Sequence, residues 1–175
     1  MPEAADPFAL LGVPASYALD AAVLRSALLR GSAESHPDRF AMAPEAERIA
    51  AETRMTTLNA AFRTLSDPLR RAEALLRRTG ADTADRSAPP DFLMEMLELR
   101  EAVEGGDTTA ADTLRDREAA AMDGLAEDFA AWEAAGMPDD GAAPLVDRLL
   151  EATYLQRLRS EANRAPGATT RDTRD

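Results

Sequence analysis

The sequence has 175 residues, a net charge of −12, 45% hydrophobic residues and no Cys. That length suits one medium domain or two small ones, and it excludes a large catalytic barrel. The missing Cys excludes disulfides, thiolate metal sites and cysteine nucleophiles, and the acidic charge disfavours nucleic acid as a partner. Aromatic residues make up only 5% while strong helix formers dominate, which predicts an all-α fold class.

The distribution of charge separates two parts of the chain. Residues 1–80 hold ten Arg and ten acidic residues, whereas residues 81–175 hold ten Arg and twenty-two acidic residues, so the whole excess lies in the second part. The start of the sequence lacks a basic, apolar leader, and no stretch approaches the ~20 apolar residues of a membrane span. We therefore expect a cytoplasmic protein without membrane contact.

Three helices are predicted in residues 1–80. The first is capped by Asp20 and runs to about Ser35, with an interruption at Gly31-Ser32. The second begins near Glu45 and carries an apolar seam at helical spacing for antiparallel packing on the first: Ala51, Met55, Leu58, Phe62 and Leu65. The third follows Asp67-Pro68 and ends at Gly80. Together they predict an N-terminal domain built on a helical hairpin.

A polar, Pro-containing linker at residues 81–91 separates this domain from a second one. Short loops connect three further predicted helices, at about 90–104, 108–134 and 143–163. Such helices favour an antiparallel three-helix bundle over residues 92–163. Residues 164–175 are polar and broken by Pro and Gly, which predicts a disordered tail.

His36-Pro37-Asp38 lies between the first two predicted helices, at the tip of the hairpin. A residue before proline favours an extended backbone, so the tripeptide ends the helix and turns the imidazole and the carboxylate outward. The same residues could serve only as a helix stop and a local turn. No nucleophile with an orienting partner accompanies this single His, so the sequence offers no catalytic residue, and no metal site is implied.

The predicted helix that begins at Pro90 has two apolar faces. At about 100° per residue, one arc of about 60° suits a bundle core and holds Phe92, Met96, Leu99 and Val103. Leu93, Met94 and Leu97 fall outside that arc. They are interleaved with charged side chains, namely Glu98, Arg100, Glu101 and Glu104. A small apolar patch with a charged rim is typical of a protein-binding site, although Leu93 and Leu97 could instead pack against another part of the chain.

Five strings of the sequence resemble the HscB family, the J-domain co-chaperones of iron–sulfur cluster assembly. They are DPFALLGVP, HPDRF, LNAAFRTLSDPLRRAEALL, FLMEMLELRE and YLQRL, and together they span nearly the whole chain. FLMEMLELRE is not shared by general J-domain proteins. The resemblance identifies residues 1–80 as a J-domain.

The resemblance implies that His36, Pro37 and Asp38 dock on an HscA-type heat-shock chaperone and stimulate its ATP hydrolysis. The resemblance also implies that a basic face on the helix leading to this loop takes part in docking, and the candidates for it are Arg25, Arg30 and Arg39. Two departures from the family pattern put this face in doubt: Ser35 stands where an aromatic residue is usual, and Gly31-Ser32 is expected to weaken the helix end.

The resemblance also implies that the second domain binds an IscU-type scaffold protein, on which clusters are built. The candidate contacts are Leu93, Met94, Leu97, Glu98, Arg100, Glu101, Glu104 and Tyr154. Glu104 replaces an acidic contact of the family that falls at Gly105.

The expected function is therefore delivery of the scaffold to the chaperone, by a protein that is not an enzyme and needs no cofactor. The nearest competing hypothesis is a general J-domain co-chaperone for unfolded clients, but the Gly/Phe-rich linker or broad client groove typical of that class is not visible. Two further hypotheses are an enzyme that uses His36 and a helical adaptor in which the tripeptide is idle.

Overall fold

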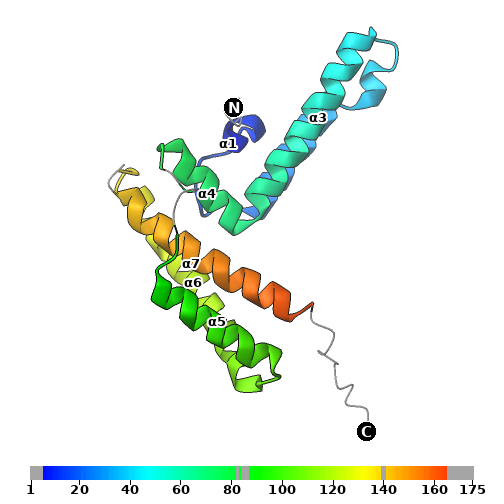
Figure 1. Ribbon diagram of the computed structural model, residues 1–175. Coiled ribbons are helices and arrows are strands. Elements are labelled where there is room, and N and C mark those ends of the chain that lie inside the picture. The colour runs from blue at the N-terminus through cyan, green and yellow to red at the C-terminus, as the bar shows by residue number, and fades with distance from the viewer. Residues whose placement is uncertain (1–5, 82, 84–86, 139–140, 165–175) are drawn as a thin grey trace.

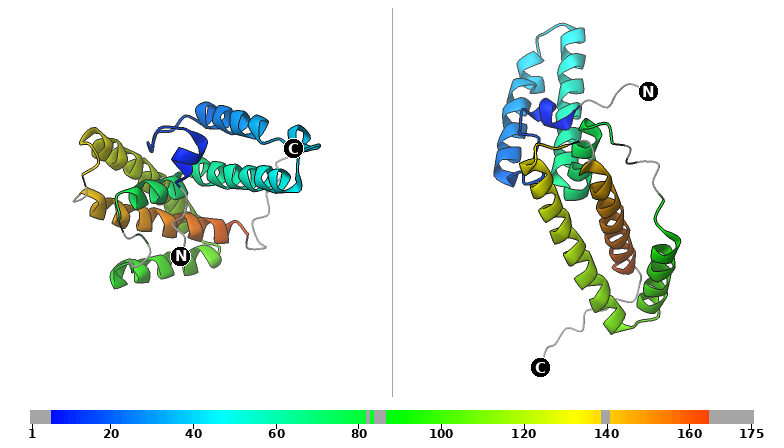
Figure 2. Two further views of the ribbon diagram at one scale, coloured as in Figure 1. Left: turned by 90° about the horizontal axis from the view of Figure 1, so that it is seen from above. Right: turned by 90° about the vertical axis from the view of Figure 1, so that its left-hand side faces the viewer.

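The computed structural model describes residues 6–81, 83, 87–138 and 141–164, and every regular element in these ranges is helical (Figures 1 and 2). The all-α prediction, a helical hairpin followed by a three-helix bundle, is confirmed. In chain order the elements are α1 (Pro7–Leu11), α2 (Ala21–Glu34), the 3-10 turn η1 (Pro37–Phe40), α3 (Glu45–Ser66), α4 (Pro68–Arg78), α5 (Pro90–Glu104), α6 (Thr108–Ala134) and α7 (Ala142–Ala162).

Helices α2 and α3 form the predicted hairpin. The Asp20 carboxylate accepts hydrogen bonds from the first backbone N–H groups of α2, as its position before the helix indicated. The seam of α3 buries Leu58 and Leu65 almost completely against the rest of the first half. The short helix α1 was not predicted, and it inserts Phe8 into the same core with 1% of its surface exposed.

The predicted interruption of α2 at Gly31-Ser32 is wrong, because the helix continues through both residues to Glu34. The glycine has a packing role instead. A Cβ atom at Gly31 would lie 2.9 Å from Leu58 Cδ1, so the absence of a side chain lets α3 approach α2 closely at this point. The packing of Leu58 offsets the conformational cost of a glycine in a helix.

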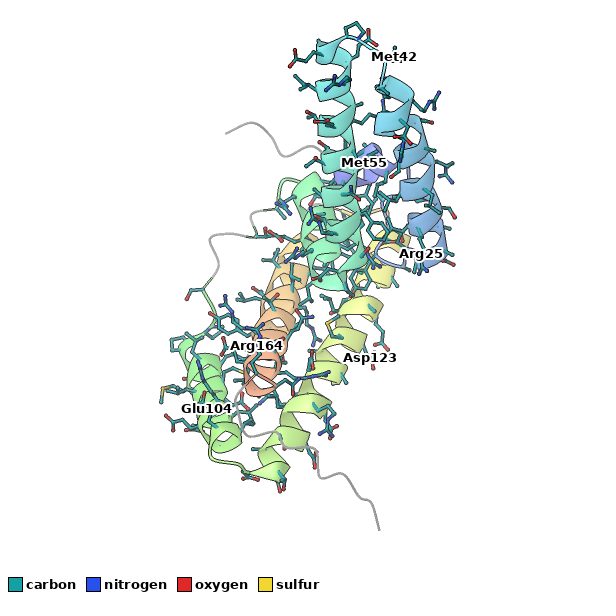
Figure 3. All side chains as sticks on the ribbon, turned by 90° about the vertical axis from the view of Figure 1, so that its right-hand side faces the viewer. Arg25, Met42, Met55, Glu104, Asp123 and Arg164 are labelled. Atoms are coloured by element: carbon teal, nitrogen blue, oxygen red, sulfur yellow. The ribbon has the colours of Figure 1, made fainter. Side chains whose placement is uncertain are left out.

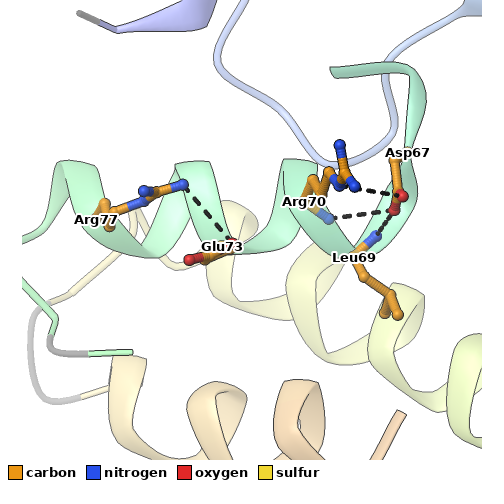
Figure 4. Close-up of polar contacts among 5 residues, drawn as sticks. All are labelled: Asp67, Leu69, Arg70, Glu73 and Arg77. Atoms are coloured by element: carbon orange, nitrogen blue, oxygen red, sulfur yellow. Dashed lines mark hydrogen bonds and ion pairs between the residues drawn. The ribbon is translucent and has the colours of Figure 1, made fainter. Parts of the chain in front are cut away.

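Helix α4 begins at the predicted cap. Asp67 Oδ1 accepts hydrogen bonds from the backbone N–H groups of Leu69 at 3.0 Å and Arg70 at 3.3 Å (Figure 4). Leu69 points from this first turn toward the helices of the second half and is buried. The cap therefore fixes the helix that connects the hairpin to the rest of the molecule.

Helices α5, α6 and α7 pack on one another as the predicted bundle, and α7 begins one residue earlier than expected. The longest helix, α6, buries Leu114, Leu125 and Phe129 against its neighbours. The proposed domain boundaries at residues 80, 91 and 163 remain predictions. The expected disordered tail comprises residues 164–175, and residues 165–175 lie outside the described residues.

The two halves share one hydrophobic core, and the chain segment between α1 and α2 joins them. The Tyr17 ring stacks on Phe129 of α6 with centroids 4.8 Å apart and planes at 9°. On the other side Arg71 of α4 lies over the same ring and donates a hydrogen bond of 2.5 Å to the Tyr17 carbonyl oxygen. Glu133 accepts hydrogen bonds from the Tyr17 backbone N–H at 2.5 Å and from the Ser16 hydroxyl at 2.8 Å. Helix α4 also packs on α7.

Replacing the carboxylate that holds this segment should destabilise the protein. Glu133→Ala leaves the Tyr17 N–H without its acceptor and is expected to lower the free energy of unfolding by about 1–3 kcal/mol. Glu133→Gln keeps one acceptor oxygen and should lose less than half as much. Glu127→Ala, an exposed position on the same helix, is the control and should stay within about 0.5 kcal/mol. Urea unfolding measures all three, and equal losses for the three variants would contradict the interpretation.

Candidate protein-binding surfaces

The His36 loop forms a compact, exposed turn at the tip of the hairpin. His36 has φ −63° and ψ 132°, the extended backbone expected before Pro37. Its Nδ1 accepts a hydrogen bond of 3.3 Å from the Asp38 backbone N–H and lies 3.5 Å from Asp38 Oδ2. The side chains of His36 and Asp38 are 54% and 90% exposed. The turn therefore holds both groups in a fixed relation and presents them to solvent.

Three arginines were named as candidates for the basic face beside this loop, and of the three only Arg39 lies on the loop itself. Arg39 Nη1 donates to the Ala33 carbonyl at 3.2 Å and so closes the C-terminal end of α2. Arg25 and Arg30 are exposed on α2. Arg25 lies about 14 Å along the helix axis from the C-terminal end of α2. They can contribute charge to a broad docking surface rather than to the loop itself.

Two apolar residues near this loop were missed in the sequence. Leu29 on α2 is 66% exposed and lies one turn from Arg25, and Met42 beyond η1 is 98% exposed. Met42 lies in the connection between η1 and α3, and Leu29 lies on the side of α2 that faces away from the buried Leu24 and Ala27. Ser35 is buried, with 2% of its surface exposed, so an aromatic side chain at this position would require the end of α2 to repack.

Helix α5 presents the second candidate surface. Leu93, Met94 and Leu97 are 37%, 58% and 48% exposed, whereas Met96 is 7% exposed. The other three residues of the predicted inner arc, Phe92, Leu99 and Val103, are half-buried and pack on the core. The division of α5 into an inner and an outer apolar face is confirmed.

Charged side chains surround this outer face. Glu98 and Glu101 are exposed. Arg100 Nε donates a hydrogen bond of 2.9 Å to Glu104 Oε1, and Arg100 Nη2 lies 3.3 Å from Glu161 Oε2 on α7. The hydrogen bond to Glu104, with the nearby Glu161 carboxylate, raises the pKa of Arg100 above its ordinary value. Glu98 and Glu101 thus supply the negative charge of the rim, while Arg100 and Glu104 neutralise each other.

Ion pairs also fix α5 on the bundle at its other edge. Glu95 accepts two hydrogen bonds from Arg117 of α6, at 2.7 and 3.2 Å. This guanidinium lowers the pKa of the Glu95 carboxyl below its ordinary value. Helix α5 is therefore held to α6 on one edge and to α7 on the other, and its outer face lies between these contacts.

Tyr154 lies at the junction of α5 and α7. Its ring meets that of Phe92 edge-on, with centroids 5.8 Å apart and planes at 89°. Tyr154 is half-buried, so it supports α5 through Phe92 and still offers part of its surface to solvent. The structure thus brings this predicted contact from the last helix against α5.

The described helices include none that is both long and apolar enough to cross a membrane.

Comparison with known proteins finds HscB proteins among the relatives of this chain. A family model described as the HSCB C-terminal oligomerisation domain matches residues 88–163. A co-chaperone protein HscB homolog of Chromobacterium violaceum is 38% identical over 117 residues, which cover 64% of this chain and 67% of the relative. A second HscB homolog, from Cupriavidus taiwanensis, is 43% identical over 102 residues, covering 57% of this chain and 58% of that protein.

Two solved structures share the fold. The chaperone HscB from Vibrio cholerae matches with a TM-score of 0.73 and 28% identity, over 91% of this chain and 96% of that one. The human co-chaperone protein HscB matches with a TM-score of 0.72 over 90% of this chain and 80% of that one, and its 21% identity supports the fold alone.

Proposed function

We propose that this chain, which belongs to the HscB family of co-chaperones, binds an IscU-type iron–sulfur scaffold protein and delivers it to an HscA-type heat-shock chaperone, whose ATP hydrolysis it stimulates. The observation that carries the proposal is the presence of two exposed surfaces of different chemistry at opposite ends of one packed molecule. In Figure 3 the loop near Met42 and helix α5, marked by Glu104, lie at those two ends. Two partners can therefore bind at the same time.

The His36 loop is the proposed trigger for the chaperone. His36, Pro37 and Asp38 dock on the ATPase. Arg25, Arg30 and Arg39 attract an acidic patch on its surface. ATP is hydrolysed by the partner. The chain itself is a co-chaperone and not an enzyme, works in the cytoplasm and needs no cofactor of its own.

The outer face of α5 is the proposed scaffold site. Leu93, Met94 and Leu97 give it an apolar centre, and Glu98 and Glu101 give it an acidic rim suited to a scaffold surface with a basic rim. Arg100, Glu104 and Tyr154 complete the contact at the α7 edge. The iron–sulfur cluster travels on the scaffold as cargo, so this chain supplies no ligand to it.

Changing the loop should abolish stimulation without unfolding the protein. His36→Gln or Asp38→Asn is expected to lower stimulation of the chaperone ATPase at least tenfold, while the melting temperature stays within a few degrees, because both side chains lie outside the core. Glu47→Gln, at an exposed position in the first turn of α3, makes the same charge change as Asp38→Asn and should stimulate normally. Steady-state phosphate release measures the effect, and normal stimulation by either loop variant would contradict it.

Changing the outer face of α5 should weaken scaffold binding without affecting stability. The double variant Leu93→Ala/Leu97→Ala is expected to lose roughly 30- to 1,000-fold in affinity, yet to unfold within about 1 kcal/mol of the parent, because both residues are exposed. Leu29→Ala removes a still more exposed leucine from α2 and should bind the scaffold normally. Calorimetric titration and thermal melts measure both properties. Unchanged affinity, or a large stability loss, would show that these leucines serve only packing.

A further inference from the structure

Helix α7 exposes a strip of its surface between α4 and α5. On one side of this strip, Thr153 and Leu150 line a groove of about 350 Å³ together with Arg70 and Glu73 of α4. On the other side, Tyr154 contacts Phe92 of α5. Consecutive residues of a helix are turned by about 100°, so the surface between Thr153 and Tyr154 connects the wall formed by α4 to the wall formed by α5.

The apolar patch on α5 lies on the edge that borders this strip. Arg100 reaches α7 through Glu161, whereas Glu95 reaches α6 through Arg117. Leu93 and Leu97 lie seven and three positions before Arg100, and residues at these spacings share one side of a helix. Both leucines therefore lie on the α7 edge of α5, toward the strip and the first domain beyond it.

The α4 wall offers a cation that is only loosely engaged. The Arg70 side chain is 65% exposed, and its Nε lies 3.6 Å from Asp67 Oδ2. Figure 4 shows Arg70, Glu73 and Arg77 along α4, with the Arg77–Glu73 pair at 3.7 Å one turn further on. Asp67 and Glu73 also line the α4 wall, so Arg70 is the cation of a mixed wall. On α5, Glu101 lies on the outer face next to Leu97, whereas Glu98 is turned toward the α6 edge. A partner that spans α7 can therefore meet Arg70 on α4 and the leucines with Glu101 on α5.

We propose that the scaffold bound to α5 also rests on α4 of the first domain, where an acidic side chain of the scaffold pairs with Arg70. This inference rests on the proposed function and extends the binding surface from the second domain across α7 to the first. The contact with Arg70 favours one orientation of the scaffold, since an acidic group of the scaffold must lie next to this guanidinium while its apolar surface covers Leu93 and Leu97. The scaffold is then oriented relative to the His36 loop by direct contact with the domain that carries the loop.

Titration of the full-length protein with the IscU-type scaffold tests this contact. Arg70→Glu is expected to weaken binding about tenfold, mostly through slower association, and Arg70→Gln should lose less. The difference in association rate between Arg70→Glu and the parent should shrink as salt screens the charges. Arg115→Glu is the matched control, because Arg115 also forms an i,i+3 pair with an aspartate and is 62% exposed. Arg115 is turned by about 200° from Arg117, which faces α5, so this control should bind normally.

Two readouts separate this inference from the proposed function. If Leu93→Ala/Leu97→Ala weakens binding while Arg70→Glu binds like the parent, the scaffold does not reach α4 and the inference is wrong, while the proposed function stands. If neither variant weakens binding, the proposed scaffold site is wrong as well. Chaperone stimulation without scaffold should be unchanged in Arg70→Glu, and a loss there would show that Arg70 contacts the chaperone instead.

Discussion

The position of Tyr17 determines how the two halves of the molecule are joined. Its ring is enclosed by Phe129 of α6 and Arg71 of α4, and its backbone is held by Glu133. Burial raises the pKa of the Tyr17 hydroxyl, against the opposing effect of Arg71, and burial lowers the pKa of Arg71. The backbone N–H of Tyr17 is bonded to Glu133, its carbonyl to Arg71, and the Arg71 guanidinium also to the Leu65 carbonyl. Such contacts are costly to break one at a time, so the hairpin and the bundle are expected to move as one body.

A fixed joint gives the two proposed binding surfaces a defined geometry. The loop at His36 is supported by α2 and α3, whose packing includes the close approach at Gly31, and α5 is supported by α6 and α7 through ion pairs at both edges. Neither surface lies at the joint. A partner on one surface therefore leaves the other free, and its orientation relative to the second partner is determined by the packing around Tyr17. Contact with Arg70 would add a direct constraint on the scaffold.

Local patterns in the sequence predicted the helices from α2 to α7, the caps at Asp20 and Asp67 and the two faces of α5, because each depends on residues within a turn or two of one another; the short helix α1 was missed. Asp20 and Asp67 directly precede the helices that they cap. Met96 and Leu97 are neighbours in the chain, and the rotation of about 100° per residue places them on different faces of α5. Such local patterns could not predict contacts between residues that lie far apart in the chain. Glu133 lies 116 and 117 residues from its partners, and the role of Gly31 depends on Leu58 of another helix. The sequence itself singled out His36 and Asp38 at the hairpin tip, but their role in docking came from the family resemblance and remains a proposal.

A distance measurement between the two halves tests the fixed joint most directly. The chain contains no Cys, so Met42→Cys at the hairpin tip and Asp116→Cys on α6 place two spin labels at exposed positions without further changes. Pulsed electron–electron resonance on the full-length protein should give a single narrow distance distribution, and Glu133→Ala should broaden it. A broad or multiple distribution in the protein with Glu133 intact would contradict the account, because the His36 loop and α5 would then have no fixed relation.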